Sequence, residues 1–167
     1  MVDIEQLTKG LSESFSQNVV EKLWESAVRE GIEVMLVGAF SINVEMWING
    51  PTCGEKVISL LDTGAQSNLI SLSLIEKLGL QHHIDTHYVP KLMGLGGKTQ
   101  TYGLLPYIET YMNGHMIPLS FTVVDQTPND HPILGIAFMR FYGVAIDFNT
   151  NKMTLGDKDI PIIVTNN

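Results

Sequence analysis

Cysteine is almost absent from this sequence, because Cys53 is the only one in 167 residues. A single thiol can form neither an intramolecular disulfide framework nor a thiolate metal cluster. The sequence therefore excludes a disulfide-stabilised scaffold, and the default compartment is the cytosol or the nucleus, where thiols stay reduced.

Basic residues and long apolar runs are also scarce. Ten Lys and Arg stand against eighteen Asp and Glu, which gives a formal net charge of −8. This charge disfavours non-specific binding to nucleic acid or to anionic membranes. No stretch reaches the ~18 apolar residues of a transmembrane helix. We therefore expect no nucleic-acid partner and no membrane partner.

The remaining composition is that of a globular chain, with 44% hydrophobic and 17% charged residues. Residues 1–33 carry apolar side chains every three or four positions, which is typical of an amphipathic helix. From residue 42 onward the apolar period becomes two, which indicates strands. We divide the chain into an N-terminal helical segment, residues 1–35, and a mainly β domain, residues 36–167. The many short strands and two short helices of that domain predict a barrel.

Within the β domain, turn residues set the expected boundaries. Asn113-Gly114 is the strongest hairpin signal in the chain. Ser73 and Glu76 have the spacing of a helix capping box, and Gly79 is placed to end that helix. The strands are expected at residues 42–48, 55–61, 88–93, 105–112, 115–124, 144–148, 152–155 and 160–164. The helices are expected at residues 71–79 and 136–142.

Two chemistries are suggested by short motifs and then rejected. Gly97-Lys98-Thr99 resembles part of a phosphate-binding loop, but position 92 is Leu where that loop needs glycine, and no helix follows. Five histidines lack the Cys or the closely spaced carboxylate pair that would complete a zinc site. We therefore expect neither a metal nor a cofactor. The histidines are His82, His83, His87, His115 and His131.

The chemistry of the chain instead centres on Asp62. An apolar strand runs into this carboxylate and is followed at once by Thr63 and Gly64. Glycine lets the chain turn sharply, so that backbone N–H groups approach the carboxylate. The Thr63 hydroxyl can tie the loop to a neighbouring segment. By itself the tripeptide is more typical of an ordinary turn, so the rest of the chain must decide.

In their order along the chain, these features resemble a retroviral-like aspartic protease (retropepsin), and they are similar to its Ddi-type (DNA-damage-inducible) eukaryotic branch. The resemblance covers about residues 38–157. The motifs that carry it are Leu61-Asp62-Thr63-Gly64-Ala65-Gln66, Gly79-Leu80 with Ile84-Asp85, residues 94–100, Pro118-Leu119-Ser120-Phe121-Thr122-Val123, Ile133-Leu134-Gly135 and Ala145-Ile146-Asp147.

The resemblance implies a retropepsin-like acid protease barrel with short helices and a homodimeric aspartic endopeptidase that acts on extended polypeptides. Asp62 would be the catalytic carboxylate, and Thr63 would lock the two active-site loops together across the dimer. The other implied roles are the active-site floor (Gly64, Ala65), substrate contact and the flap (Gln66, Gly94, Leu95, Gly96, Gly97), and a structural counterpart loop (Ile133, Leu134, Gly135).

The sequence departs from the family at Ala137, where such proteases usually carry Asp or Asn, so alanine replaces the side chain whose hydrogen bonding would anchor this helix. A catalytically weak, dimeric peptide-binding module of the same fold is the main alternative. A protease that processes its own retroelement polyprotein is another.

Overall fold

The computed structural model describes residue 9 and residues 16–30, 39–49, 54–92 and 100–166. The chain divides into two compact units, Met1–Phe40 with Asn166–Asn167, and Ser41–Thr165. In the first unit, helix α2 (Gln17–Glu30) forms within the segment predicted to be helical. No helix in the described part of the chain is long and apolar enough to cross a membrane. The rest of the predicted segment, residues 1–8, 10–15 and 31–35, lies outside the described residues.

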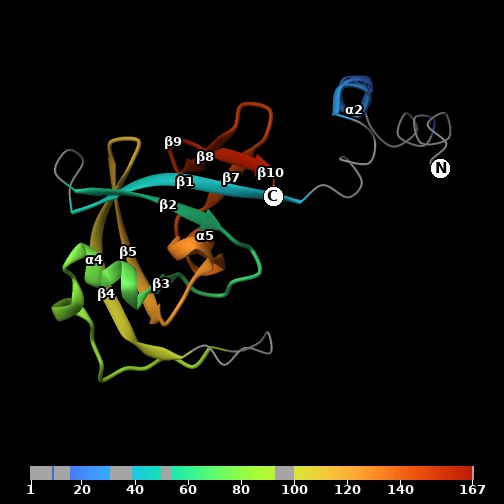
Figure 1. Cartoon of the computed structure of the whole chain (residues 1–167). Helices are drawn as coiled ribbons and strands as arrows, with labels where there is room; N and C mark the ends of the chain where they lie inside the picture. The colour runs from blue at the N-terminus through green and yellow to red at the C-terminus, as the bar shows by residue number, and fades with distance from the viewer. Residues whose placement is uncertain (1–8, 10–15, 31–38, 50–53, 93–99, 167) are drawn as a thin grey trace. The chain divides into compact units, whose positions relative to one another are not determined.

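The second unit is mainly β, as predicted (Figure 1). Seven strands form one sheet in the order β10-β1-β2-β6-β3-β5-β4, and β7-β8-β9 form a second sheet. The strands are β1 (Phe40–Ile48), β2 (Glu55–Leu61), β3 (Leu69–Ser71), β4 (Thr101–Met112), β5 (His115–Val124), β6 (Ile133–Leu134), β7 (Val144–Asp147), β8 (Lys152–Leu155), β9 (Lys158–Pro161) and β10 (Ile163–Asn166). The helices are α4 (Leu72–Leu78) and α5 (Ile136–Phe141), with 3₁₀ turns η1 (Gln81–His83) and η2 (Pro128–Asp130).

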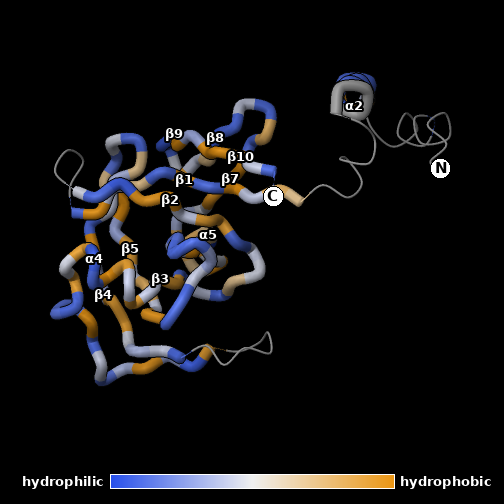
Figure 2. Tube along the Cα trace, viewed as in Figure 1, coloured by the Kyte–Doolittle hydropathy of each residue, from blue (hydrophilic) through white to orange (hydrophobic). Residues whose placement is uncertain are grey.

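The large sheet curls so that non-consecutive strands meet. The β1–β2 pair runs across the β4–β5 hairpin in Figure 1, and β1 also pairs with β4 through Trp47↔Tyr111 and Ile48↔Thr110. Alternation along β1 buries Val44, Met46 and Ile48 completely. Hydrophobic residues lie mainly along the strands of this unit, whereas its turns are largely hydrophilic (Figure 2). Burial of this apolar surface is the main favourable contribution to folding.

Several turn residues behave as predicted. Asn113 and Gly114 both have positive φ, 50° and 77°, which suits the tight β4–β5 hairpin. Gly79 ends α4 with φ 71°, and its N–H donates to the carbonyl oxygens of Glu76 and Ile75.

The predicted cap of α4 is wrong. The N-cap is Ser71, whose hydroxyl accepts a hydrogen bond from the backbone N–H of Leu74. The Ser73 hydroxyl instead donates to the Asp130 carboxylate at 2.8 Å, so a tertiary contact takes the residue that the local spacing assigned to the cap.

The predicted strand at residues 88–93 is also wrong for its described part, residues 88–92. Pro90 has no N–H to donate to a ladder, and Tyr88 and Val89 are exposed. The extended pairing occurs earlier in the chain, where Asp85 forms a bridge with Leu104, a residue of β4.

The expected tail strand at residues 160–164 is divided in two. β9 ends at Pro161 and β10 begins at Ile163, with Ile162 buried between them. The Asn43 side chain donates to Thr165 Oγ1 and so ties β1 to β10, whereas Ile163 remains 40% exposed. The tail is therefore only partly covered within one chain.

Candidate active site

Asp62 follows the last residue of β2, at the point where two distant segments run in parallel. β2 pairs with β6 through Leu60↔Ile133 and Leu61↔Leu134. The N–H of Asp62 then donates to the Leu134 carbonyl oxygen at 3.0 Å. This hydrogen bond fixes the backbone from which the Asp62 side chain extends. β6 therefore sets the position of the carboxylate at the end of β2.

The turn after Asp62 folds back so that its backbone N–H groups bond to Asp62. The N–H of Gly64 donates to Asp62 Oδ1 at 2.8 Å, and the N–H of Ala65 donates to the Asp62 carbonyl oxygen at 3.2 Å. A Cβ atom on Gly64 would lie only 3.1 Å from Oδ1, so glycine allows this close approach. Asp62 is half-buried, whereas Thr63, Gly64 and Gln66 are exposed. The loop thus presents an oriented carboxylate among accessible neighbours.

Residues 133–135 and the start of α5 pack against this loop and form hydrogen bonds with it. The N–H of Ile136 donates to the Ala65 carbonyl oxygen at 2.8 Å, and the N–H of Ala137 donates to the Gln66 carbonyl oxygen at 3.0 Å. Helices leave their first N–H groups without intrahelical partners, and here the loop carbonyls accept from them. The backbone therefore provides an anchor at Ala137, where the side chain can make no hydrogen bond.

Gly135 is required by the closeness of this packing. A Cβ atom there would lie 2.6 Å from the Ala65 carbonyl oxygen and 2.7 Å from that of Ser67. Both are backbone atoms and cannot rotate away, so any other residue must push the two segments apart. The two predicted loops are thus brought into direct contact.

Sequence reasoning missed Asn68, which lies at the end of the Asp62 loop. Its side chain is buried, accepts from the N–H of Gly135 at 3.0 Å and donates to the Ser120 carbonyl oxygen at 3.1 Å. The one available signal was an amide residue placed between the active-site motif and the apolar residues of β3.

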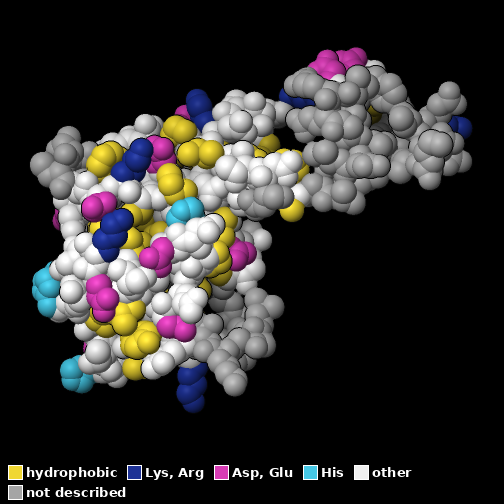
Figure 3. Space-filling view, viewed as in Figure 1, with side chains coloured by type: hydrophobic (Ala, Val, Ile, Leu, Met, Phe, Trp, Pro, Cys, Tyr) yellow, Lys and Arg dark blue, Asp and Glu magenta, His cyan; other side chains and the backbone are white. Residues whose placement is uncertain are grey.

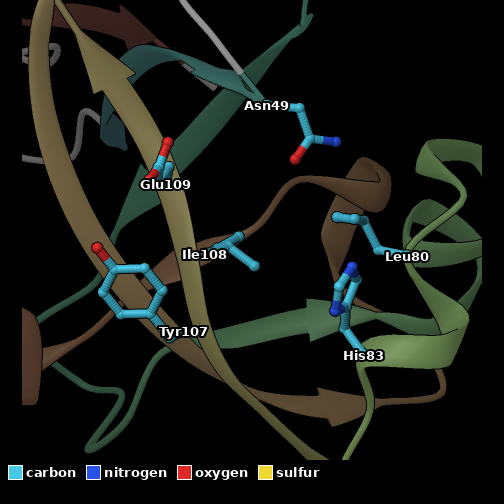
Figure 4. Close-up of a pocket in the computed structure, with 6 residues that line it drawn as sticks. All are labelled: Asn49, Leu80, His83, Tyr107, Ile108 and Glu109. Carbon is cyan, nitrogen blue, oxygen red and sulfur yellow. The ribbon is translucent and has the colours of Figure 1, made fainter.

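The predicted flap residues, Gly94, Leu95, Gly96 and Gly97, lie outside the described residues. A cavity of about 340 Å³ opens elsewhere, beside β4. Leu80 and Ile108 point toward each other across it, whereas Tyr107 and Glu109 lie on the other side of the strand (Figure 4). None of residues 62–68 lines this cavity, so it is not the candidate site.

The surface and the titratable residues add little further chemistry. In the described part of the chain, no three His, Cys, Asp or Glu side chains are grouped so that they could hold a metal ion. On the face shown in Figure 3, the described Lys and Arg side chains are scattered and form no basic patch.

Comparisons with known proteins agree on the family of this fold. A family model described as aspartyl protease matches residues 37–147. The chain is 27% identical over 163 residues to the UBA domain-containing protein Mud1 of Schizosaccharomyces pombe, covering 98% of this chain and 47% of that protein. It is 26% identical over 160 residues to the Arabidopsis thaliana protein DNA-DAMAGE INDUCIBLE 1, covering 96% and 37%. The chain thus spans less than half the length of either relative.

Among solved structures, the retroviral protease-like domain of Ddi1 from Leishmania major matches this chain with a TM-score of 0.64. The two are 22% identical, and the match covers 74% of this chain and 94% of that one. At this identity the likeness concerns the fold, and it agrees with the barrel predicted from the sequence.

Proposed function

Because this chain belongs to the aspartyl protease family, as a retropepsin-like domain of the Ddi type, we propose that it is a homodimeric aspartic endopeptidase. Its substrate would be an extended polypeptide. Such a segment can bind by strand-like backbone hydrogen bonds, with alternate side chains entering pockets.

The observation that carries the proposal is the Asp62 carboxylate, held by the N–H of Gly64 in a half-exposed loop. Aspartic proteases hydrolyse peptide bonds with two neighbouring carboxylates that share one proton. The chain has a single Asp-Thr-Gly and no Asp-Ser-Gly. The second carboxylate must then come from Asp62 of a second copy, which a two-fold symmetric dimer supplies.

In the proposed reaction, one Asp62 is ionised and the other is protonated. The ionised carboxylate takes a proton from a water molecule as the water oxygen attacks the peptide carbonyl carbon. The protonated carboxyl donates a hydrogen bond to the carbonyl oxygen, which stabilises the negative charge that develops there. Transfer of a proton to the leaving nitrogen then allows the C–N bond to break. Two like charges this close cannot both ionise, so the pair titrates as a unit.

The neighbouring residues take supporting roles in this proposal. Thr63 reaches across the two-fold axis to the partner loop, and Gly64 and Ala65 form the floor. Gln66 and residues 94–97 contact the substrate, the latter as a flap. Residues 133–135 hold the loop from below through the contacts described above.

The test compares three forms of the full chain against a proteome-derived peptide library from pH 3 to 7. Asp62→Asn should fold and dimerise but lose peptidase activity, because an amide cannot exchange a proton with water during the reaction. Asp147→Asn is the matched control, since Asp147 Oδ1 accepts from the N–H of Asn149 at 2.8 Å in the same kind of turn. It should cleave as wild type does. Wild-type protein that cleaves nothing while binding peptides would instead identify a binding module.

A further inference from the structure

The structure assigns Asn68 as the positioning residue for Asp62, an inference that rests on the proposed peptidase function. Asn68 does not touch the reacting atoms. It acts by joining the last residue of the Asp62 loop to Gly135, next to Leu134, which binds the first residue, so that the carboxylate keeps a single position.

Three contacts hold Asn68 itself, and two of them go to β5. Its backbone carbonyl oxygen accepts from the N–H of Thr122 at 2.8 Å. Its side-chain nitrogen donates to the Ser120 carbonyl oxygen at 3.1 Å, so both the backbone and the side chain are tied to that strand. Only 8% of Asn68 is exposed. Burying an amide costs desolvation free energy unless its hydrogen bonds are made.

The remaining contact completes a closed ring. Asn68 Oδ1 accepts from the N–H of Gly135 at 3.0 Å, and the adjacent residue Leu134 accepts from the N–H of Asp62 at 3.0 Å. The loop of residues 62–68 is therefore bound at its first and last residues to two consecutive residues of one segment. A loop closed at both ends has less freedom than a loop held at one end.

This ring of hydrogen bonds also compensates for the alanine at position 137, whose side chain forms no hydrogen bond. The Ala137 side chain has no donor or acceptor, and only its backbone N–H reaches the loop, at Gln66. In the described residues, the side chain that links the loop to the start of α5 belongs to Asn68. The side-chain link thus comes from the loop and not from the helix.

Substitution with leucine, which has a similar shape, should break the ring. In Asn68→Leu the buried N–H of Gly135 loses its acceptor, and an unpaired buried group is costly. The first residue of the loop keeps its bond to Leu134, and Ala65 and Gln66 keep their bonds to the N–H groups of Ile136 and Ala137, but Asn68 no longer bonds to Gly135. Small displacements of a catalytic group slow chemistry far more than they weaken binding. The turnover number kcat should therefore fall while KM stays nearly constant.

The experiment measures kcat, KM, thermal midpoint and amide exchange at Gly135 in the chain of 167 residues. It is done where specific activity no longer rises with protein concentration. The control is Thr110→Val, which removes a different buried side-chain donor to a β5 carbonyl, the Thr110 hydroxyl that donates to Ile117, away from the Asp62 loop. Asn68→Ser is a milder companion that carries the same comparison if Asn68→Leu does not fold.

The expected result is a fall in kcat of about 10-fold or more for Asn68→Leu, KM within about twofold, and faster exchange at Gly135. Thr110→Val should keep kcat within about twofold of the wild-type value, even if its thermal midpoint falls as much as that of Asn68→Leu. Unchanged kcat in the Asn68 variants, or an equal loss in Thr110→Val, would overturn the positioning role alone. A wild-type protein without peptidase activity would overturn the proposed function and this inference together.

Discussion

The backbone N–H of Asp62 donates to the carbonyl oxygen of Leu134 at 3.0 Å, immediately beyond the last β2–β6 register pair. The position of the candidate catalytic carboxylate thus depends on a segment that lies far away in the sequence. Changes at residues 133–137 should therefore disturb the site although none of these residues is expected to meet the substrate.

Gly135→Ala should destabilise the protein by about 3 kcal/mol, because the added methyl group overlaps two backbone carbonyl oxygens that cannot move aside. Gly143→Ala is the control, since Gly143 has φ 59° but a Cβ there meets nothing within 4 Å. It should cost about 1 kcal/mol through backbone strain alone. Urea unfolding at one fixed protein concentration measures both values. Equal costs would show that the close approach at Gly135 does not constrain the fold.

Ser59→Ala should leave the free energy of unfolding unchanged or raise it by about 1 kcal/mol, because the fully buried Ser59 hydroxyl has no hydrogen-bond partner among the residues that the structure describes. The comparison is Ser71→Ala, at an equally buried serine whose hydroxyl caps α4 and donates to Asp130. That variant should lose about 1 kcal/mol. A similar loss at both serines would mean that Ser59 has a partner after all.

Asp130 should make stability depend on pH. The hydroxyls of Ser71 and then Ser73 donate to its carboxylate and lower its pKa from the ordinary value of 3.8, with a smaller contribution from Lys77 and His131. A lowered native pKa means that the unfolded chain binds the proton more readily. The stabilising contribution is therefore present above about pH 4 and is lost as the pH falls through the native pKa.

Asp130→Asn should accordingly be less stable than wild type at pH 7, by under about 1 kcal/mol because the carboxylate is exposed to solvent. The difference should shrink as the pH is lowered below about 4 in urea unfolding experiments. Asp157→Asn is the control, because the Asp157 side chain is 95% exposed and should show little effect. A difference that stays constant or grows on acidification would contradict the assigned hydrogen bonds.

Local sequence signals predicted much of the fold. The period-two pattern located β1, and the run ending at Leu61 located β2 with the observed bounds. Asn113-Gly114 and Gly79 marked the turns correctly because their positive φ is a property of the residues themselves. The Asp62 loop and its counterpart at Gly135 were recognisable as separate motifs, and the structure places them in contact.

The features that were missed depend on partners distant in sequence. Ser73 has the spacing of a cap, yet it bonds to Asp130. Residues 88–92 have the composition of a strand, yet they lack a paired neighbour in the described structure. The only local signal for Asn68 is an amide before the apolar residues of β3, and it does not reveal the role, because Ser120 and Gly135 meet Asn68 only after the chain has folded.

The most direct test of the paired Asp62 site is the activity of mixtures of wild type and Asp62→Asn at constant total protein, after the subunits have exchanged. Only dimers with two wild-type subunits should be active, so random pairing in an equal mixture should leave about one quarter of the wild-type activity. An equal mixture with Asp147→Asn should retain full activity. If the Asp62→Asn mixture keeps about one half, each chain works by itself, and a site shared between two copies of Asp62 is contradicted.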